Sequence, residues 1–177
     1  MKRIKTDDAT IIDEAYRALN ARYNNLYQFV MHYATYIYST HSYGGAEPLT
    51  MIEVHTLTYI EDHPGTTSSD LVKYWDKTKG AISQVLTRLE KKGLITKEKT
   101  KDNGKTLHLY VTSEGQRLSE AHKLYDIKDI AKTVSHLQEK CTAEEIETFF
   151  KVISVYNEVM RKDFELNSGH RAEGKKK

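Results

Sequence analysis

The chain has 177 residues, of which 27 are Lys or Arg and 25 are Asp or Glu, so its formal net charge is +2. This length is enough to bury a core in one domain or in two small lobes. With 38% hydrophobic and 29% charged residues, the chain is too apolar for a disordered protein and too polar for a membrane protein. It has no apolar run near the roughly 20 residues of a membrane span and no signal core. We therefore expect a soluble, cytoplasmic protein with no membrane partner.

The charge is distributed unevenly along the chain. Between Lys77 and Lys105, nine basic residues stand against three acidic ones, so this segment carries +6 while the whole chain carries +2. A solvated surface is the ordinary explanation of such a cluster, but a basic block in a near-neutral protein also fits a polyanionic partner. The elements predicted around the block decide between the two.

The first predicted element is a long helix at residues 8–40. Apolar or aromatic residues recur along it at alternating steps of three and four, and no Pro or Gly interrupts them, which is typical of an amphipathic helix. A helix of about 30 residues is about 45 Å long, longer than a small monomer covers. We expect part of its apolar face to contact another chain.

Three short helices follow, each with its own start signal. Capping-box patterns at 50–53 and 67–70 begin the first two, and Thr78 can cap the third. The third helix carries cations in its last turn and stops at Gly93, a strong C-terminal signal.

The period of the pattern then changes from helix to strand. Residues 94–99 and 107–111 alternate apolar and polar side chains, and Asp-Asn-Gly at 102–104 suits the tip of a hairpin. Two short helices, a third with a basic outer face and a basic hairpin form the order of a winged helix-turn-helix. We predict a mainly α fold with a small β-hairpin wing, flanked by long helices.

Two further helices are predicted after the wing. One begins near Thr112 and runs to about Lys140, and a capping box at 142–145 begins the last. The predicted organisation is an N-terminal dimerisation helix at 8–45, a winged helix-turn-helix DNA-binding lobe at 49–115, C-terminal dimerisation helices at 116–166 and a disordered tail at 167–177.

The residues around the wing resemble the MarR family of bacterial transcriptional regulators. The resemblance rests on Arg-Leu-Glu-Lys-Lys at 88–92, Gly-Leu-Ile at 93–95 and Val-Thr-Ser-Glu-Gly at 111–115. It is close over residues 49–115, and the helices on both sides agree with it. The resemblance implies a homodimer joined by its first and last helices, with each recognition helix in a major groove and each wing at the flanking minor groove. It also implies a repressor released by a small ligand, commonly a phenolic or other aromatic acid.

Side-chain chemistry on this frame gives the predicted contacts to a pseudo-palindromic duplex with half-sites about one helical turn apart. Gln84 can pair with adenine, and Arg88 with guanine or a phosphate. Gln84 and Thr87 also fit as ordinary helix-surface residues. The predicted DNA-binding residues are Ser68, Ser69, Lys77, Lys79, Ser83, Gln84, Thr87, Arg88, Lys97, Lys99, Lys101, Asn103 and Lys105.

Two segments depart from the family pattern. The wing reads Asp-Asn-Gly-Lys at 102–105, where the family usually has an Asp-x-Arg element, so Lys105 or Lys101 would make the contact of the usual arginine. A lysine lacks the planar fork that reads a narrow groove. The recognition helix has Gly80 and Ala81 where small hydroxyl residues are common, which removes two polar contacts.

Aromatic residues provide the candidate effector pocket. Seven of the 12 tyrosines lie between Tyr16 and Tyr43, and they fit core and dimer packing as well as a ligand site. The predicted ligand-binding residues are Tyr23, Tyr27, His55 and Tyr59.

We predict no metal site, no cofactor and no catalytic residue. The eight histidines contain no pair at i, i+4, although five of them (His32, His41, His55, His108 and His122) could converge in three dimensions. Cys141 is interpreted as structural or incidental, because Lys140 is the one nearby residue that could activate a thiol. The alternatives left open are a winged-helix protein-interaction module and a metal-responsive member of the same family. No phosphate loop, nucleophile elbow or carboxylate pair indicates an enzyme.

Overall fold

The computed structural model describes the backbone of residues 9–44, 47–99 and 106–173, with side chains from residue 10 to residue 162 within those ranges. It divides into two compact units, residues 1–125 and residues 126–177. The fold is mainly α with a small antiparallel sheet, as predicted.

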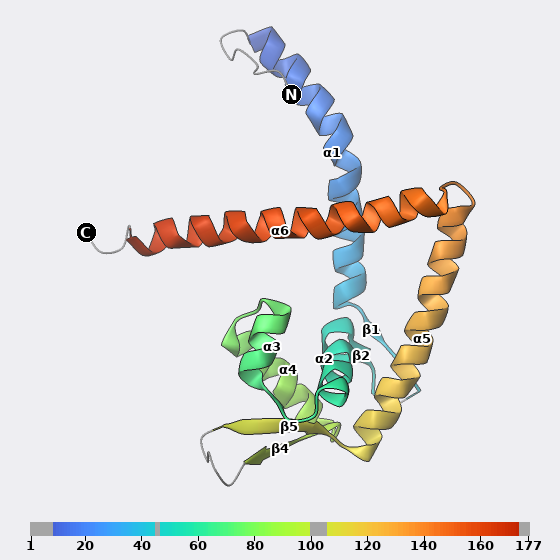
Figure 1. The fold of residues 1–177 in the computed structure, drawn as a ribbon, viewed down its shortest axis with the longest axis vertical. Coiled ribbons are helices and arrows are strands. Elements are labelled where there is room, and N and C mark those ends of the chain that lie inside the picture. The colour runs from blue at the N-terminus through green and yellow to red at the C-terminus, as the bar shows by residue number, and fades with distance from the viewer. Residues whose placement is uncertain (1–8, 45–46, 100–105, 174–177) are drawn as a thin grey trace. The chain divides into compact units, whose positions relative to one another are not determined.

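The first unit contains a lobe of three helices and a three-stranded sheet (Figure 1). The helices are α2 (Met51–Asp62), α3 (Ser68–Trp75) and α4 (Lys79–Lys91). The strands are β3 (Thr66–Thr67), β4 (Ile95–Lys99) and β5 (Leu107–Val111), in the order β3-β5-β4. The hairpin of β4 and β5 is the predicted wing, whereas β3, which pairs Thr66 with Leu109, was not predicted.

The predicted start signals are confirmed. Thr50 and Glu53 form a complete capping box at α2, and Thr67 and Asp70 form one at α3. Thr78 caps α4 by accepting from the amide of Ala81 at 3.2 Å. Local side-chain oxygens thus satisfy amides that the first turn of a helix leaves without partners.

The predicted stop of α4 is also confirmed. Gly93 has φ +68°, a left-handed conformation that glycine adopts without strain. The chain then turns back, and the amide of Leu94 donates to the carbonyl of Leu89 at 3.0 Å. This stop places the start of β4 next to the end of α4.

One apolar core holds the lobe together. α4 contributes Ile82, Val85, Leu86 and Leu89, and all four side chains are nearly inaccessible to solvent. They pack with apolar residues of α2, α3, β4 and β5 and of the segments just before α2 and β4: Leu49, Val54, Leu57, Ile60, Leu71, Leu94, Ile95 and Leu109. Because these residues form one stripe of α4, the opposite face of that helix is left to solvent.

Helix α5 (Ser113–Gln138) begins against the stop of α4. A Cβ placed on Gly115 would lie 2.0 Å from the carbonyl oxygen of Leu94. The same oxygen accepts from the amide of Thr112 at 3.0 Å, and the Thr112 hydroxyl donates to the carbonyl of Gly93 at 2.7 Å. Only glycine fits this approach, so the first turn of α5 is fixed to the end of α4.

The first half of α5 is tied to α2 by polar contacts. The buried Ser119 hydroxyl donates to the Thr58 hydroxyl at 2.9 Å. The Lys123 ammonium lies 3.0 Å from Glu61 and 2.9 Å from Asp62. Hydrogen bonds to these two carboxylates raise the pKa of Lys123 above its ordinary value, so Lys123 remains charged at neutral pH.

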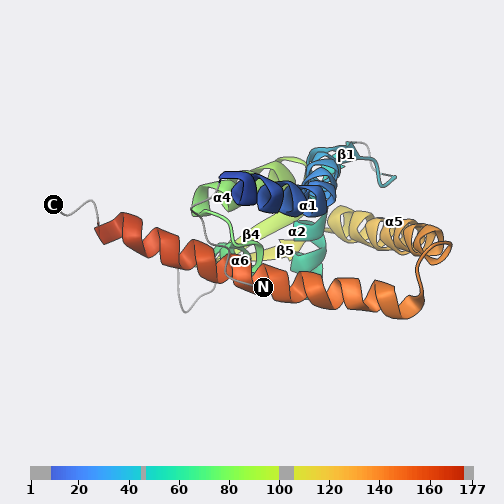
Figure 2. The same ribbon diagram turned by 90° about the horizontal axis from the view of Figure 1, so that it is seen from above.

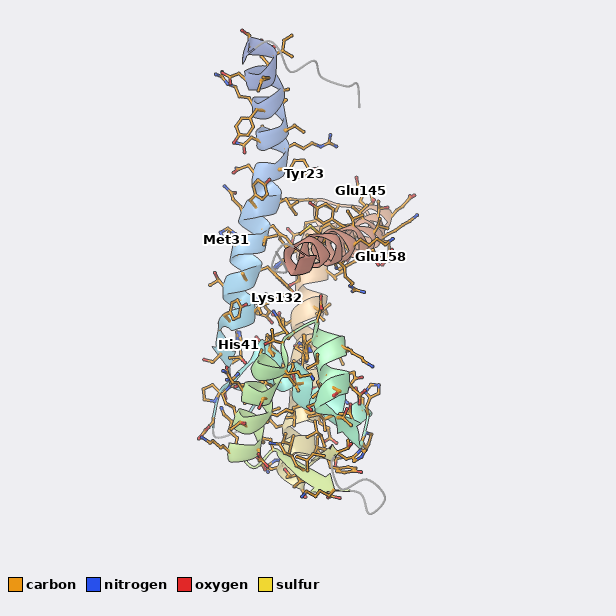
Figure 3. All side chains as sticks on the ribbon, turned by 90° about the vertical axis from the view of Figure 1, so that its left-hand side faces the viewer. Tyr23, Met31, His41, Lys132, Glu145 and Glu158 are labelled. Carbon is orange, nitrogen blue, oxygen red and sulfur yellow. The ribbon has the colours of Figure 1, made fainter. Side chains whose placement is uncertain are left out.

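Helix α1 (Ala9–Tyr38) spans the length predicted for it. After α1 in the sequence, β1 (Thr40–His41) and β2 (Leu49–Thr50) form a short antiparallel pair, which was not predicted. Side chains such as Tyr23 and Met31 project from α1 into solvent (Figure 3). Its exposed large apolar residues are Ile11, Ile12, Tyr16, Leu19, Tyr23, Tyr27, Phe29, Val30, Met31, Tyr33 and Tyr38.

The second unit contains the end of α5 and the helix α6 (Ala143–Glu173), which runs without a break (Figure 2). The predicted capping box begins α6, because Thr142 and Glu145 exchange hydrogen bonds. Its exposed large apolar residues are Phe149, Phe150, Val152, Val155, Tyr156, Val159 and Met160.

The boundary predicted at residue 166 is wrong, because α6 continues to Glu173 through seven residues expected to be disordered. A helix that has already formed adds one hydrogen bond for each residue it fixes, so a polar composition alone does not end it. Residues 174–177 lie outside the described part of the chain. In the described part, no helix has the length and apolar composition to cross a membrane.

We predict that Gly115→Ala lowers the free energy of unfolding by about 1–3 kcal/mol, because the added methyl group would overlap a backbone oxygen. The control is Gly80→Ala, where a Cβ meets only the Thr78 hydroxyl at 4.0 Å, so a neutral or slightly stabilising effect is expected. Urea unfolding followed by circular dichroism measures both. Equal effects of the two substitutions would contradict the close contact at Gly115.

Candidate nucleic-acid interface

The solvent face of α4 carries the predicted recognition residues. Ser83, Gln84, Thr87 and Arg88 are all exposed, on the face opposite the buried apolar stripe. The Thr87 hydroxyl donates to the carbonyl of Ser83 at 2.8 Å. Its proton is therefore used within the helix, and Thr87 meets a partner mainly as an acceptor.

The start of α3 provides a second exposed polar surface. Ser68 and Ser69 are the first two residues of the helix, and both are exposed. Amides at a helix start suit phosphate oxygens. Asp70 already occupies part of this end, since its carboxylate accepts from the Thr67 hydroxyl at 2.7 Å and from the Thr67 amide at 2.9 Å. These hydrogen bonds, the hydroxyl first, hold the pKa of Asp70 below its ordinary value.

The predicted lysines differ in their surroundings. Lys77, Lys79 and Lys99 are exposed. Lys97 is half-buried, and its ammonium lies 2.6 Å from the Glu90 carboxylate, so it joins the wing to α4. Three of the predicted residues, Lys101, Asn103 and Lys105, lie outside the described residues.

Arg88 has a protein partner that the sequence did not indicate. Its Nε donates to the carboxylate of Glu53, a residue of α2 that is only 3% exposed. Burial disfavours the charge on Glu53, but hydrogen bonds from the Thr50 amide and the Arg88 guanidinium outweigh burial and hold the pKa of Glu53 below its ordinary value. Glu53 is recognisable in the sequence as a capping-box residue, whereas its contact with a residue 35 positions away is not.

The four predicted ligand-binding residues lie in three different surroundings. Tyr23 and Tyr27 contact each other on α1, with ring centroids 6.3 Å apart. His55 packs edge-on against His122, with ring centroids 4.6 Å apart. Tyr59 lies against Tyr74, with ring centroids 4.2 Å apart.

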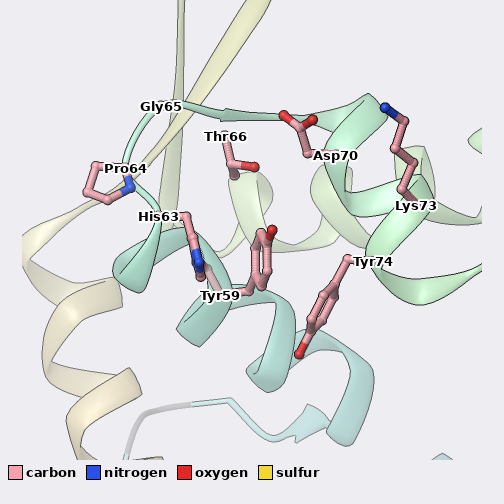
Figure 4. Close-up of a pocket in the computed structure, with 8 residues that line it drawn as sticks. All are labelled: Tyr59, His63, Pro64, Gly65, Thr66, Asp70, Lys73 and Tyr74. Atoms are coloured by element: carbon pink, nitrogen blue, oxygen red, sulfur yellow. The ribbon is translucent and has the colours of Figure 1, made fainter.

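Tyr59 and Tyr74 also line an open cavity of about 710 Å³ between the end of α2, the following turn and α3 (Figure 4). His63 stacks on Tyr59 there at 4.2 Å. The remaining lining residues are Pro64, Gly65, Thr66, Asp70 and Lys73.

A second cluster lies where α2 meets α5. One ligand atom from each of His55, His122 and Asp126 lies within 4.8 Å of the other two. Asp126 follows His122 by four residues on one helix, which places both on the same side of α5. The sequence analysis named His55 and His122 among five histidines that could converge, but it did not consider Asp126, which forms a mixed pair with His122 at the i, i+4 spacing.

Comparison with known proteins finds relatives of this lobe. A model of the MarR family matches residues 48–105. YhjH of Bacillus subtilis (strain 168), named an uncharacterized HTH-type transcriptional regulator, is 28% identical over 104 residues, which are 59% of this chain and 59% of that protein. The chain thus matches about three fifths of the length of this relative.

Several solved structures share the fold at low sequence identity. FabT of Streptococcus pneumoniae, solved in complex with DNA, is 21% identical, with a TM-score of 0.60 over 83% of this chain and 98% of that one. The zinc-responsive ZitR of Lactococcus lactis is 17% identical, with a TM-score of 0.62 over 80% and 99%. The transcriptional regulator SlyA is 17% identical, with a TM-score of 0.57 over 91% and 99%. YhjH and SlyA are both named transcriptional regulators.

Proposed function

We propose that this chain, whose residues 48–105 match a model of the MarR family, is a homodimeric, sequence-specific repressor of transcription. A small effector releases it from its operator. The observation that carries the proposal is the polar outer face of α4. This face points to solvent because four apolar residues on the opposite side of the helix are buried in the core. A regulator of this kind acts where the bacterial chromosome lies, in the cytoplasm.

Three groups of side chains supply the contacts in this proposal. Gln84 and Ser83 on α4 meet base edges in the major groove. Ser68 and Ser69 at the start of α3 meet phosphates. The exposed lysines around α4 and on the wing supply the charge that attracts any duplex, which makes binding salt-dependent.

The dimer is proposed from the apolar surface that the chain exposes. Both α1 and α6 carry a series of large apolar side chains in solvent, including Met31 at 68% and Val152 at 57% exposed. Contiguous apolar surface of this extent is typical of an interface. We propose that residues 8–45 and 116–166 form the dimer and that residues 49–115 read one half-site each.

The effector in this proposal acts by changing the separation of the two recognition helices. A ligand that binds better to one arrangement of the dimer shifts the population toward it. An arrangement whose helices no longer match successive major grooves releases the operator. The cavity beside Tyr59, which among the four predicted ligand-binding residues is the one that lines it, is the proposed place for an aromatic acid.

We predict that Gln84→Ala weakens binding to the operator relative to a scrambled duplex by roughly 1–3 kcal/mol, because it removes a paired contact to a base. Fluorescence anisotropy across a salt series, on a duplex selected from random DNA, measures both affinities. Gln116→Ala is the matched control, since Gln116 is an exposed helical glutamine on α5 paired with Glu120. Equal losses on both duplexes would contradict base reading by Gln84. No salt-sensitive binding to any duplex would favour a protein-interaction module.

We predict that Phe150→Glu shifts the protein from dimer to monomer, because the Phe150 side chain is 54% exposed in a single chain and its replacement by a charge opposes burial against a second copy. Sedimentation at several concentrations measures the shift. Lys151→Glu, a charge change at the neighbouring exposed position, is the control and is expected to remain dimeric. A monomeric parent protein would contradict the proposed dimer.

A metal-responsive regulator is the second candidate function, and the cluster of His55, His122 and Asp126 favours it. Imidazole nitrogens and a carboxylate are ligands that zinc accepts. Tetrahedral coordination at 2.0–2.1 Å places two ligand atoms about 3.4 Å apart, so three atoms within 4.8 Å need to move only slightly. A water would complete the coordination.

We predict for this candidate that the protein competes with a chromogenic chelator for zinc and that Asp126→Asn lowers its affinity at least about tenfold, because the amide is a poorer ligand than the carboxylate. His63→Gln, which changes an exposed histidine directly after the helix that carries His55, is the control. A zinc-dependent change in operator affinity, lost in Asp126→Asn, would support metal response. Zinc binding that is unchanged in Asp126→Asn would contradict this site.

A further inference from the structure

The recognition helix is attached to α2 through a carboxylate that is almost completely buried. The side chain of Glu53 is 5% exposed and that of Arg88 is 47% exposed. The contact uses Arg88 Nε, the inner edge of the guanidinium. Arg88 therefore turns one edge toward α2, and only part of the group reaches the surface.

The same carboxylate also begins α2. Glu53 Oε2 accepts from the Thr50 amide at 3.0 Å, and the Glu53 amide donates to the Thr50 hydroxyl at 3.3 Å. One oxygen thus fixes the first turn of α2 and the other fixes α4. Because the cap limits the rotamers of Glu53, its position is set before Arg88 binds to it.

A second cation, the C-cap residue Lys92 of α4, reinforces the attachment. The Lys92 ammonium donates to the carbonyl of Pro48 at 2.8 Å and lies 3.3 Å from the Glu47 carboxylate. The last turn of α4 is thereby held against residues 47–53. Gln84 lies one helical turn before Arg88 on the same side of α4, so the orientation of Arg88 is coupled to that of Gln84.

We propose that Glu53 is a positioning residue for DNA reading and that Arg88 is the anchor of the recognition helix rather than a reader of bases. Glu53 does not touch DNA, but it sets the tilt at which α4 enters the groove. The inference rests on the proposed function, since it assumes that α4 reads DNA. It replaces the sequence-based prediction that Arg88 pairs with guanine.

Electrostatics alone predicts the opposite outcome of removing this charge. A carboxylate near a DNA-binding surface repels phosphates, so neutralising it would tighten binding to every duplex. If Glu53 positions α4, its loss weakens binding to the operator and leaves scrambled DNA unaffected or slightly tighter. The sign of the change on the operator therefore separates the two explanations.

The experiment compares Glu53→Gln with Glu98→Gln, which removes one negative charge from an exposed position on β4. We expect operator affinity of Glu53→Gln to fall roughly tenfold, as loss of hydrogen bonds to a charged group implies, with no loss on the scrambled duplex. Glu98→Gln should bind both duplexes as tightly as the parent or more tightly, because it removes only a charge that repels phosphates. Tighter binding of Glu53→Gln to the operator would overturn the proposal.

The double variant Glu53→Gln/Arg88→Gln tests whether the two residues act as one unit. Residues that act through each other are non-additive, so we expect the double variant to lose no more operator affinity than the worse single variant. Losses that multiply would show that Arg88 contacts DNA independently of Glu53 and would overturn its role as an anchor.

Hydrogen exchange on the free protein separates failure of this inference from failure of the proposed function. We expect amides of residues 82–91 to exchange faster in Glu53→Gln than in the parent, while those of residues 113–125 are unchanged. If no duplex is preferred by the parent, the proposed function fails, and faster exchange in α4 alone still supports the attachment. Unchanged exchange in α4 would overturn it.

Discussion

The lobe depends on one constraint, which is that α4 packs into the core with a single narrow stripe. Ile82, Val85, Leu86 and Leu89 fix which side of the helix faces inward. They also fix which side faces outward, and so they determine the chemistry that the protein presents. A stripe of apolar contacts permits sliding and rocking, because packing forces have little direction. The polar attachments at the end of α4 supply the direction that apolar packing lacks.

Much of this lobe could be predicted from the sequence because its signals are local. Capping boxes, the glycine after α4 and the change of period at Leu94 each involve residues within a few positions of one another. The strand β3 was missed because two threonines carry no periodicity, and only pairing with Leu109 makes them a strand. The end of α6 was misplaced because composition describes average tendencies, whereas helix extension is cooperative.

The candidate sites were harder to predict, because they depend on contacts between distant residues. Arg88 has the chemistry of a base contact in the sequence, and its contact with Glu53 becomes visible only when α2 and α4 are packed together. His55 and His122 are 67 positions apart, yet their rings touch. Tyr23 and Tyr59 were grouped because both are aromatic, but their helices place them in separate surroundings. Residue type indicates what a side chain can do, and the fold decides which partner it has.

The approach of Gly115 to Leu94 has a mechanical consequence. The contact between Gly115 and the Leu94 carbonyl has no room for one methyl group, so the two segments cannot shift relative to each other. The first turn of α5 and the end of α4 must therefore move as one rigid unit. The polar contacts of Ser119 and Lys123 with α2 hold the first half of α5 in place. A tilt of this part of α5 therefore rotates α4 as well, because the contact between the two helices leaves no room for independent movement.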